Sequence, residues 1–136
     1  PKFVSRLQST SPLQLPEDIN RSIECLQNDD SATSSMVVSK AQQPPIKALK
    51  QNGKYLNPYF RELGIEIVNR QELSMAYYRS NIITSRVSSF LETGNQIGEK
   101  SIKVEIPIER SIDINSELDF YLAEKIAEKF GLCLNN

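Results

Sequence analysis

The sequence contains no histidine. That absence excludes the Ser-His and Cys-His nucleophile pairs, histidine-ligated zinc sites and a histidine general base. Any chemistry has to use carboxylates, lysine, arginine, tyrosine or serine, or a metal ion held by oxygen ligands. The chain also has no excess of positive charge, because it contains 16 Lys and Arg residues and 17 Asp and Glu residues. We therefore expect no nucleic-acid partner.

Cysteine and long apolar runs are also scarce. Cys25 and Cys133 lie far apart and show no CxxC spacing, so we expect two reduced thiols in or near a core, as in a cytoplasmic protein, rather than a disulfide framework or a zinc site. No apolar run approaches the roughly 20 residues of a membrane helix, and we expect no signal peptide. The chain starts at Pro1 with strand-like residues, which indicates the interior of a longer protein.

The residues that are present are sufficient for one domain. The chain has 136 residues, of which 39% are hydrophobic and 24% charged. The pattern predicts a strand at 2–8, a helix that begins at Pro16, and a second strand at 32–38. Strand, helix and strand in this order predict a βαβ unit, the building block of parallel sheets, and therefore an α/β fold.

The middle of the chain breaks this rhythm. Asn52-Gly53 between short β-prone runs predicts a β-hairpin at 44–57, followed by an irregular arm at 58–80. The whole segment 42–80 has exposed aromatic residues and too little apolar pattern for its own core, so we expect it to cover a second copy in a homodimer. Beyond the arm we expect strands at 81–86 and 102–106 and helices at 87–92 and 116–130.

Two groups of polar residues flank this predicted sheet. The loop at 8–13 directly follows the first strand, where ligands sit in open α/β sheets, although a serine-rich turn would have the same composition. Arg70 and Arg79, with Tyr77 beside them, could bind a carboxylate or phosphate through their guanidinium groups, or could belong to a solvated loop.

A third group precedes the last helix. Asp113 and Asn115 are two residues apart and so face the same way on an extended segment. Their oxygens suit Mg²⁺, but the same residues are common in the turn before a helix. Lys47, after Pro44-Pro45, is a weaker candidate, because a lone lysine on a hairpin is usually solvated.

Taken in order, these segments resemble the acylneuraminate cytidylyltransferases, also called CMP-sialic acid synthetases. The resemblance covers residues 4 to about 128 and rests on four motifs. They are 7–13, close to the family's LQPTSPLR; Glu-Asp-Ile at 17–19; 70–73 with Tyr77, similar to RQ[DE]LPxxY; and 109–115 with 117–120, close to ERSIDIDTELDF.

The resemblance implies a Rossmann-like nucleotidyltransferase fold with a three-layer sheet, truncated at its N-terminus, with 42–80 as an inserted dimerisation arm. It implies transfer of CMP from CTP to a nonulosonic sugar acid of sialic, legionaminic or pseudaminic type, with Mg²⁺ and release of pyrophosphate. It also implies the site residues: Gln8, Ser11, Lys47, Arg70, Tyr77 and Arg79 for substrate, Asp113 and Asn115 for the metal, and Asp113 for catalysis.

The chain also departs from the family pattern. Asn115 replaces the second Asp of the IDID motif, and Ser85 stands where the family has an aromatic residue. The family's glycine- and lysine-bearing CTP loop has no counterpart in these residues, so we expect this chain alone to be inactive. Two alternatives therefore stay open, a non-catalytic homologue that binds a sugar acid and a pure dimerisation module.

Overall fold

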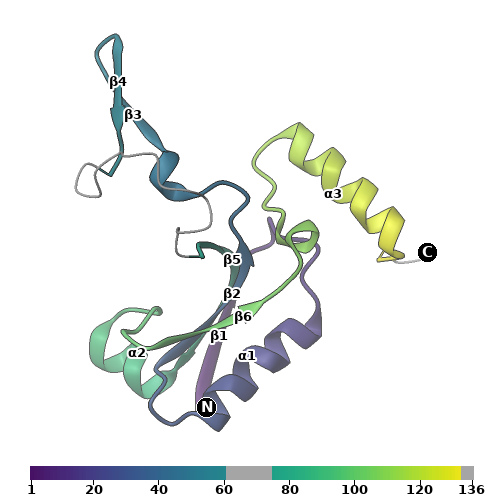
Figure 1. The fold of residues 1–136 in the computed structure, drawn as a ribbon. Coiled ribbons are helices and arrows are strands. Elements are labelled where there is room, and N and C mark those ends of the chain that lie inside the picture. The colour runs from purple at the N-terminus through teal and green to yellow at the C-terminus, as the bar shows by residue number, and fades with distance from the viewer. Residues whose placement is uncertain (61–74, 133–136) are drawn as a thin grey trace. The chain divides into compact units, whose positions relative to one another are not determined.

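The computed structural model describes residues 1–60 and 75–132, which form a mixed α/β fold with three α-helices. It divides into two compact units, residues 1–39 with 79–136, and residues 40–78. The helices and strands of the first unit are shown in Figure 1. In chain order they are β1 (Phe3–Leu7), α1 (Pro16–Asn28), β2 (Ser34–Lys40), β5 (Tyr77–Arg86), α2 (Val87–Thr93), β6 (Ser101–Glu105), the 3-10 helix η2 (Ile108–Ser111) and α3 (Glu117–Phe130).

The central sheet has the strand order β1-β5-β2-β6 and is mixed. β2 and β6 are parallel, whereas β1 and β5 are antiparallel, with Arg6 opposite Ile83. The backbone N–H of Arg86, at the end of β5, donates to the carbonyl of Thr33 just before β2 at 3.0 Å, so β5 also runs antiparallel to β2. The predicted βαβ unit therefore exists, but its two strands are not neighbours, because β5 lies between them.

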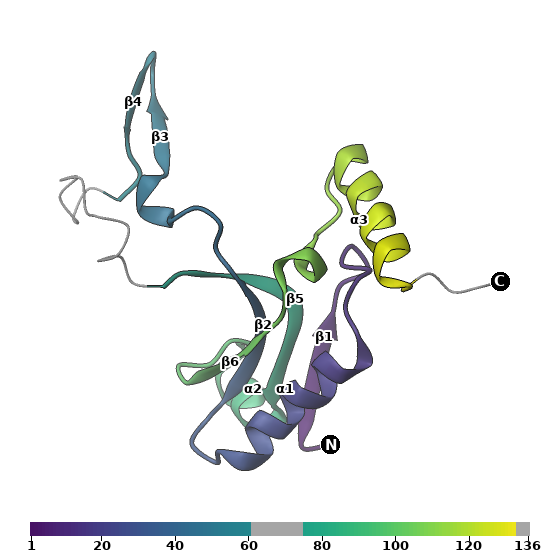
Figure 2. The ribbon, with the colours of Figure 1, turned by 45° about the vertical axis from the view of Figure 1, so that its right-hand side comes forward.

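The main core lies between α1 and one face of the sheet, as Figure 2 shows. Its buried residues are Val37 on β2, Ile82 on β5, Val104 on β6 and Ile106 directly after β6. Ile19 and the free thiol of the half-buried Cys25 pack against them from α1. The reduced thiol predicted for Cys25 thus borders the core, while Cys133 lies outside the described residues.

Part of the helix–sheet contact is unusually polar. The hydroxyl of Ser22 on α1 hydrogen-bonds Thr84 on β5 at 2.7 Å, and Thr84 in turn hydrogen-bonds Ser5 on β1 at 2.8 Å. Ser35 on β2 donates to the carbonyl of Ser22 at 2.7 Å. In the described part of the chain every buried side-chain nitrogen or oxygen has a hydrogen-bond partner, so these hydroxyls are buried without an unsatisfied group. They fix the direction in which α1 crosses the sheet.

The second unit contains the predicted hairpin. A 3-10 helix, η1 (Pro45–Lys47), is followed by β3 (Leu49–Asn52) and β4 (Tyr55–Pro58), which pair as an antiparallel hairpin. Gly53 in the turn has φ 61°, the left-handed conformation that glycine adopts without strain. The hairpin is therefore confirmed from Leu49 onward, whereas residues 44–48 are not part of it.

One further expectation needs correction, and another is confirmed. The irregular arm predicted for 58–80 ends earlier, because β5 already begins at Tyr77. The first four residues of β5, Tyr-Tyr-Arg-Ser at 77–80, are largely polar and do not alternate between apolar and polar, so the sequence did not predict a strand there. The predicted helix at 116–130 is confirmed, with Ser116 as its N-cap and Gly131 in the left-handed conformation at its C-terminus. Leu118 on this helix is nevertheless 65% exposed, and Ala123 is its one buried residue. No helix among the described residues is long and apolar enough to cross a membrane.

Candidate functional site

Polar side chains from three segments meet beyond the end of β1. The side-chain Nδ2 of Asn81 on β5 donates to Ser11 Oγ at 2.6 Å and to Asp113 Oδ1 at 2.9 Å. The Nδ2 of Asn115 donates to Asp113 Oδ2 at 3.2 Å. We call these four residues the Asp113 cluster. The structure thus brings together three residues singled out from the sequence, Ser11, Asp113 and Asn115, and adds Asn81.

The backbone holds the cluster in place from two sides. The N–H of Ile114 donates to the carbonyl of Thr10 at 2.8 Å, which ties the segment before α3 to the loop after β1. Ser11 closes that loop by donating its N–H to the carbonyl of Gln8 at 3.3 Å, and its side chain is buried. Gln8 itself is exposed directly after the last residue of β1, so its amide is free to meet a ligand at this edge.

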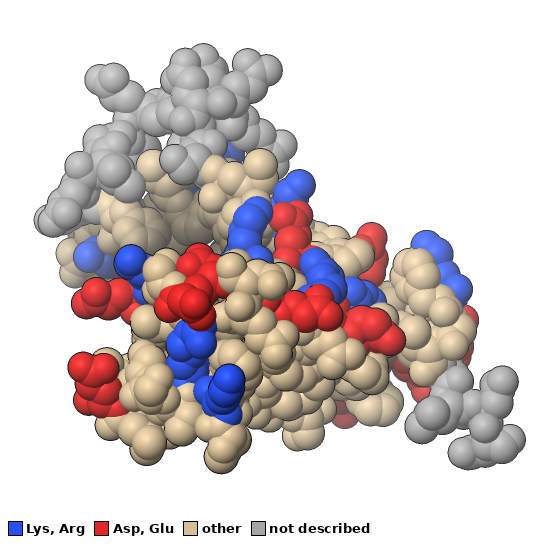
Figure 3. Space-filling model, turned by 90° about the horizontal axis from the view of Figure 1, so that it is seen from below, with Lys and Arg blue, Asp and Glu red and all other residues tan. Residues whose placement is uncertain are grey.

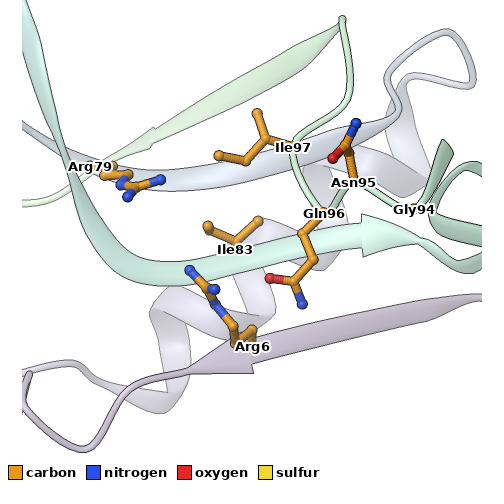
Figure 4. A pocket seen from close by; sticks show the side chains of 7 residues that line it. All are labelled: Arg6, Arg79, Ile83, Gly94, Asn95, Gln96 and Ile97. Carbon is orange, nitrogen blue, oxygen red and sulfur yellow. The ribbon is translucent and has the colours of Figure 1, made fainter.

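A pocket of about 250 Å³ lies on the sheet face that α1 does not cover. Figure 4 shows Arg6 from β1 and Arg79 from β5 on either side of Ile83, with the loop after α2 along another wall. That loop supplies Gly94, Asn95, Gln96 and Ile97. The pocket therefore combines an apolar floor with two guanidinium groups and amide side chains, a combination that suits a polar anionic ligand.

The pocket and the Asp113 cluster share one face of the sheet. Alternate residues of a strand point to the same side, so Arg79, Asn81 and Ile83 of β5 face together. Arg6 is paired directly with Ile83 and joins them. Thr84 points the other way, toward α1, as its hydrogen bond to Ser22 shows. Of these residues, Arg79 and Ile83 line the pocket, while Asn81 between them in sequence belongs to the Asp113 cluster.

The loop after α2 is fixed against the strands. The hydroxyl of Ser85 donates to the carbonyl of Gln96 at 2.5 Å, and Ser34 accepts the N–H of Gly98 at 3.0 Å. A Cβ at Gly98 would lie 2.7 Å from the Cβ of Thr33, so only glycine fits this approach. Ser85 thus positions the pocket wall through its hydroxyl.

The Asp113 cluster fits Mg²⁺ in a restricted way. The Asp113 side chain is exposed, and each carboxylate oxygen accepts one amide hydrogen bond. Asn115 directs its NH₂ group, not its oxygen, toward that carboxylate. Residues 1–60 and 75–132 contain no group of three or more acidic or cysteine side chains placed to hold a metal. The cluster therefore offers one carboxylate, and Mg²⁺ often binds through one carboxylate with waters and substrate oxygens.

The other predicted site residues lie elsewhere. Lys47 is exposed in η1, within the unit formed by 40–78, and Tyr77 is half-buried at the start of β5. Arg70 lies outside the described residues. Sequence reasoning missed Asn81 and Arg6. Asn81 could have been found, because it is two residues from Arg79 on a strand, whereas Arg6 enters the pocket only through the pairing of β1 with β5.

Charged side chains of both signs are mixed on the face of the molecule seen in Figure 3. Lys103 and Glu105 of β6 form an ion pair, with Nζ of Lys103 3.2 Å from Oε2 of Glu105. This mixture agrees with the net charge of −1 and contrasts with the paired arginines of the pocket.

Comparison with known proteins adds no identification. No protein-family model matches the chain. A search of curated proteins also returned no significant match.

Proposed function

We propose that this chain is part of a cytidylyltransferase that transfers CMP from CTP to a nonulosonic sugar acid and releases pyrophosphate. The observation that carries the proposal is the meeting of two motifs about a hundred residues apart, the loop that contains Ser11 and the segment that contains Asp113, both bridged by Asn81. The mixed sheet and the α/β fold are compatible with a Rossmann-like nucleotidyltransferase domain.

The pocket supports the choice of an acidic sugar as substrate. A nonulosonic acid carries a carboxylate next to its anomeric carbon, and arginine binds a carboxylate through two parallel N–H donors. Arg6 and Arg79 provide such donors beside the buried Ile83, against which an apolar ring face can lie. Gln8, at the end of β1, is placed to hydrogen-bond sugar hydroxyls.

The Asp113 cluster would act at the reacting group. The anomeric hydroxyl oxygen forms a bond to the α-phosphorus of CTP, the bond to pyrophosphate breaks, and the hydroxyl proton is released. Bound Mg²⁺ would neutralise phosphate charge and ease loss of that proton. In this chain Asp113 would hold the ion, while Asn81, which also donates to Ser11, would orient the Asp113 carboxylate.

We further propose that residues 42–80 mediate a homodimer. In the hairpin Leu49, Tyr55 and Leu56 are 56%, 65% and 66% exposed. An isolated two-stranded hairpin is only marginally stable in water, so these apolar side chains need a surface to cover. A second copy of the chain, related by two-fold symmetry, is the commonest arrangement that supplies one.

The alternative is a homologue that binds a sugar acid without transferring CMP. One observation favours it, namely that Asn115 donates to Asp113 instead of adding a second carboxylate. Both functions predict ligand binding in the pocket, but only the first predicts metal-dependent turnover in a protein that also supplies the CTP loop.

A binding experiment tests the proposal. The chain labelled with ¹⁵N is titrated with a panel of sialic, legionaminic and pseudaminic acids. We expect one member of the panel to shift the amides of Ile83, Gln96 and Ile97, which line the pocket, while residues of the hairpin stay unchanged. If no acid in the panel perturbs these amides at millimolar concentration, the proposed substrate class is wrong.

A further inference from the structure

Asp18 is a carboxylate almost completely removed from solvent, with 1% of its surface exposed. It lies in the first turn of α1, outside the Asp113 cluster. Its Oδ2 accepts the backbone N–H of Leu15 at 3.0 Å and Arg110 Nη1 at 2.5 Å, and its Oδ1 accepts Arg110 Nη2 at 3.1 Å. Arg21, which is half exposed, approaches Oδ1 only to 3.8 Å. Asp18 and Arg110 therefore form a two-pronged, largely buried ion pair.

This ion pair attaches α1 to the segment that carries Asp113. Arg110 belongs to η2, and three residues later the chain reaches Asp113. The next residue, Ile114, is bound through its N–H to the carbonyl of Thr10. The short segment from Arg110 to Ile114 is thus fixed at both ends, by a side-chain fork at one end and a backbone hydrogen bond at the other. Asp113 lies between the two attachments.

We propose that Asp18 and Arg110 are positioning residues for the Asp113 carboxylate, an inference that rests on the proposed function of the cluster. A buried ion pair adds little stability over an apolar pair of similar volume, because desolvation offsets most of the attraction. A bidentate arginine–carboxylate pair, however, fixes both distance and orientation. Its effect here is to set where η2 ends, and so where Asp113 meets Asn81.

The two-pronged contact between Asp18 and Arg110 requires these two residue types. Lysine at position 110 would keep the charge but lose the planar fork, so it could not hold the two carboxylate oxygens together. Asparagine at position 18 would keep the shape but replace one acceptor with a donor facing the guanidinium. Both substitutions should therefore loosen the attachment even in a folded protein.

The test compares three changes with a matched control. Arg110→Lys, Asp18→Asn and the apolar double variant Asp18→Leu/Arg110→Met are each labelled with ¹⁵N. Arg21→Met is the control, since Arg21 also lies near Asp18 but is not part of the segment that carries Asp113. Circular dichroism and amide dispersion establish conditions in which each protein is folded. The readouts are the Asn81 side-chain NH₂ resonances and the exchange rate of the Ile114 amide.

We expect the three variants, but not Arg21→Met, to shift the Asn81 NH₂ resonances and to speed Ile114 exchange by about tenfold or more. A purely structural role would lower stability, leave the Asn81 resonances unchanged in the folded protein and speed Ile114 exchange no more than the exchange of amides in the central strands. In particular, a folded Asp18→Leu/Arg110→Met variant with native Asn81 and Ile114 signals would overturn the inference. Failure of the wild-type chain to bind any sugar acid would instead overturn the proposed function, which separates the two outcomes.

Discussion

Asn81 and Asp113 are 32 residues apart in sequence, yet Nδ2 of Asn81 lies 2.9 Å from Oδ1 of Asp113. The same nitrogen also reaches Ser11 at 2.6 Å. Asn81 therefore connects β5, the loop after β1 and the segment before α3. Because the Asn81 amide donates to a carboxylate, a negative charge at position 81 would repel Asp113 even if the side-chain shape were kept.

Substitution of Asn81 tests this connection. Asn81→Asp places a second carboxylate beside Asp113, removes the donor and should lower the free energy of unfolding by about 1 kcal/mol, with partial recovery at high salt. Asn81→Ala removes the donor without adding charge and should show no such salt dependence. Asn20, exposed on α1, supplies the control Asn20→Asp. Urea denaturation at two salt concentrations measures the effect, and equal stability of Asn81→Asp and wild type would contradict it.

The two arginines of the pocket give a second prediction. Arg6→Ala and Arg79→Ala should each weaken binding of the sugar acid by about tenfold or more, because each removes a charge-assisted hydrogen bond. Arg21→Ala, a change of the same charge outside the pocket, should leave affinity unchanged. The methyl ester of the same sugar acid should bind the wild type weakly and lose little more in the variants. Calorimetry or amide titration provides the affinities, and an ester that binds as well as the acid would show that the arginines do not recognise a carboxylate.

Metal binding gives a third prediction. Asn115→Asp adds a second carboxylate next to Asp113 and should tighten Mg²⁺ or Mn²⁺ binding, because hard cations prefer charged oxygen ligands. Asp113→Ala should abolish binding at the cluster and leave the fold intact, since Asp113 is exposed. Paramagnetic broadening of the Ile114 amide by Mn²⁺ reports both effects. Full retention of broadening in Asp113→Ala would identify the carboxylate as a turn residue only.

Local features of this fold could be predicted from the sequence because local physics determines them. Pro16 begins α1 as expected, Gly53 of the Asn-Gly pair lies in the hairpin turn with Lys54 while Asn52 ends β3, and the helix expected at 116–130 forms with Ser116 as its N-cap. Each of these structures depends on residues only a few positions apart. The turn at Gly53, for example, follows from the one residue type that adopts positive φ freely.

The pairing of strands that are distant in the sequence could not be predicted in the same way. The insertion of β5 between β1 and β2, which places Arg6 opposite Ile83, depends on contacts between residues about eighty positions apart. Ser11 and Asp113 were singled out separately, but only the structure brings them to the same Asn81. The partner of Arg110 was also hidden, since a charged residue in the first turn of α1 looks like a favourable dipole contact rather than a buried ion pair.

The N-cap of α3 makes a prediction about pH. The carboxylate of Asp119 accepts hydrogen bonds from the Ser116 hydroxyl and from the backbone N–H of Asn115. These two hydrogen bonds, the one from Ser116 above all, hold the pKa of Asp119 below its ordinary value of 3.8. A lowered pKa in the folded state stabilises the protein above the unfolded pKa, and that contribution is lost as the pH falls through the folded value. Ser116→Ala should raise the pKa of Asp119 toward 3.8 and weaken the acid dependence of unfolding. Carboxyl ¹³C titration measures the shift, and an unchanged Asp119 pKa in Ser116→Ala would contradict the assigned cause.

The exposed hairpin gives the last prediction, which concerns assembly. If Tyr55 and Leu56 contact a second copy, a charge at either position is buried without a partner, and the dimer should dissociate. We therefore expect the wild type to sediment as a dimer at tens of micromolar and Leu56→Asp to sediment as a monomer. Leu91→Asp is the matched control, because Leu91 is 75% exposed on α2, outside the hairpin, and should leave the dimer intact. A wild type that is monomeric at this concentration would remove the dimerisation role from residues 42–80, and a dimer disrupted equally by Leu91→Asp would place the contact elsewhere than the hairpin alone.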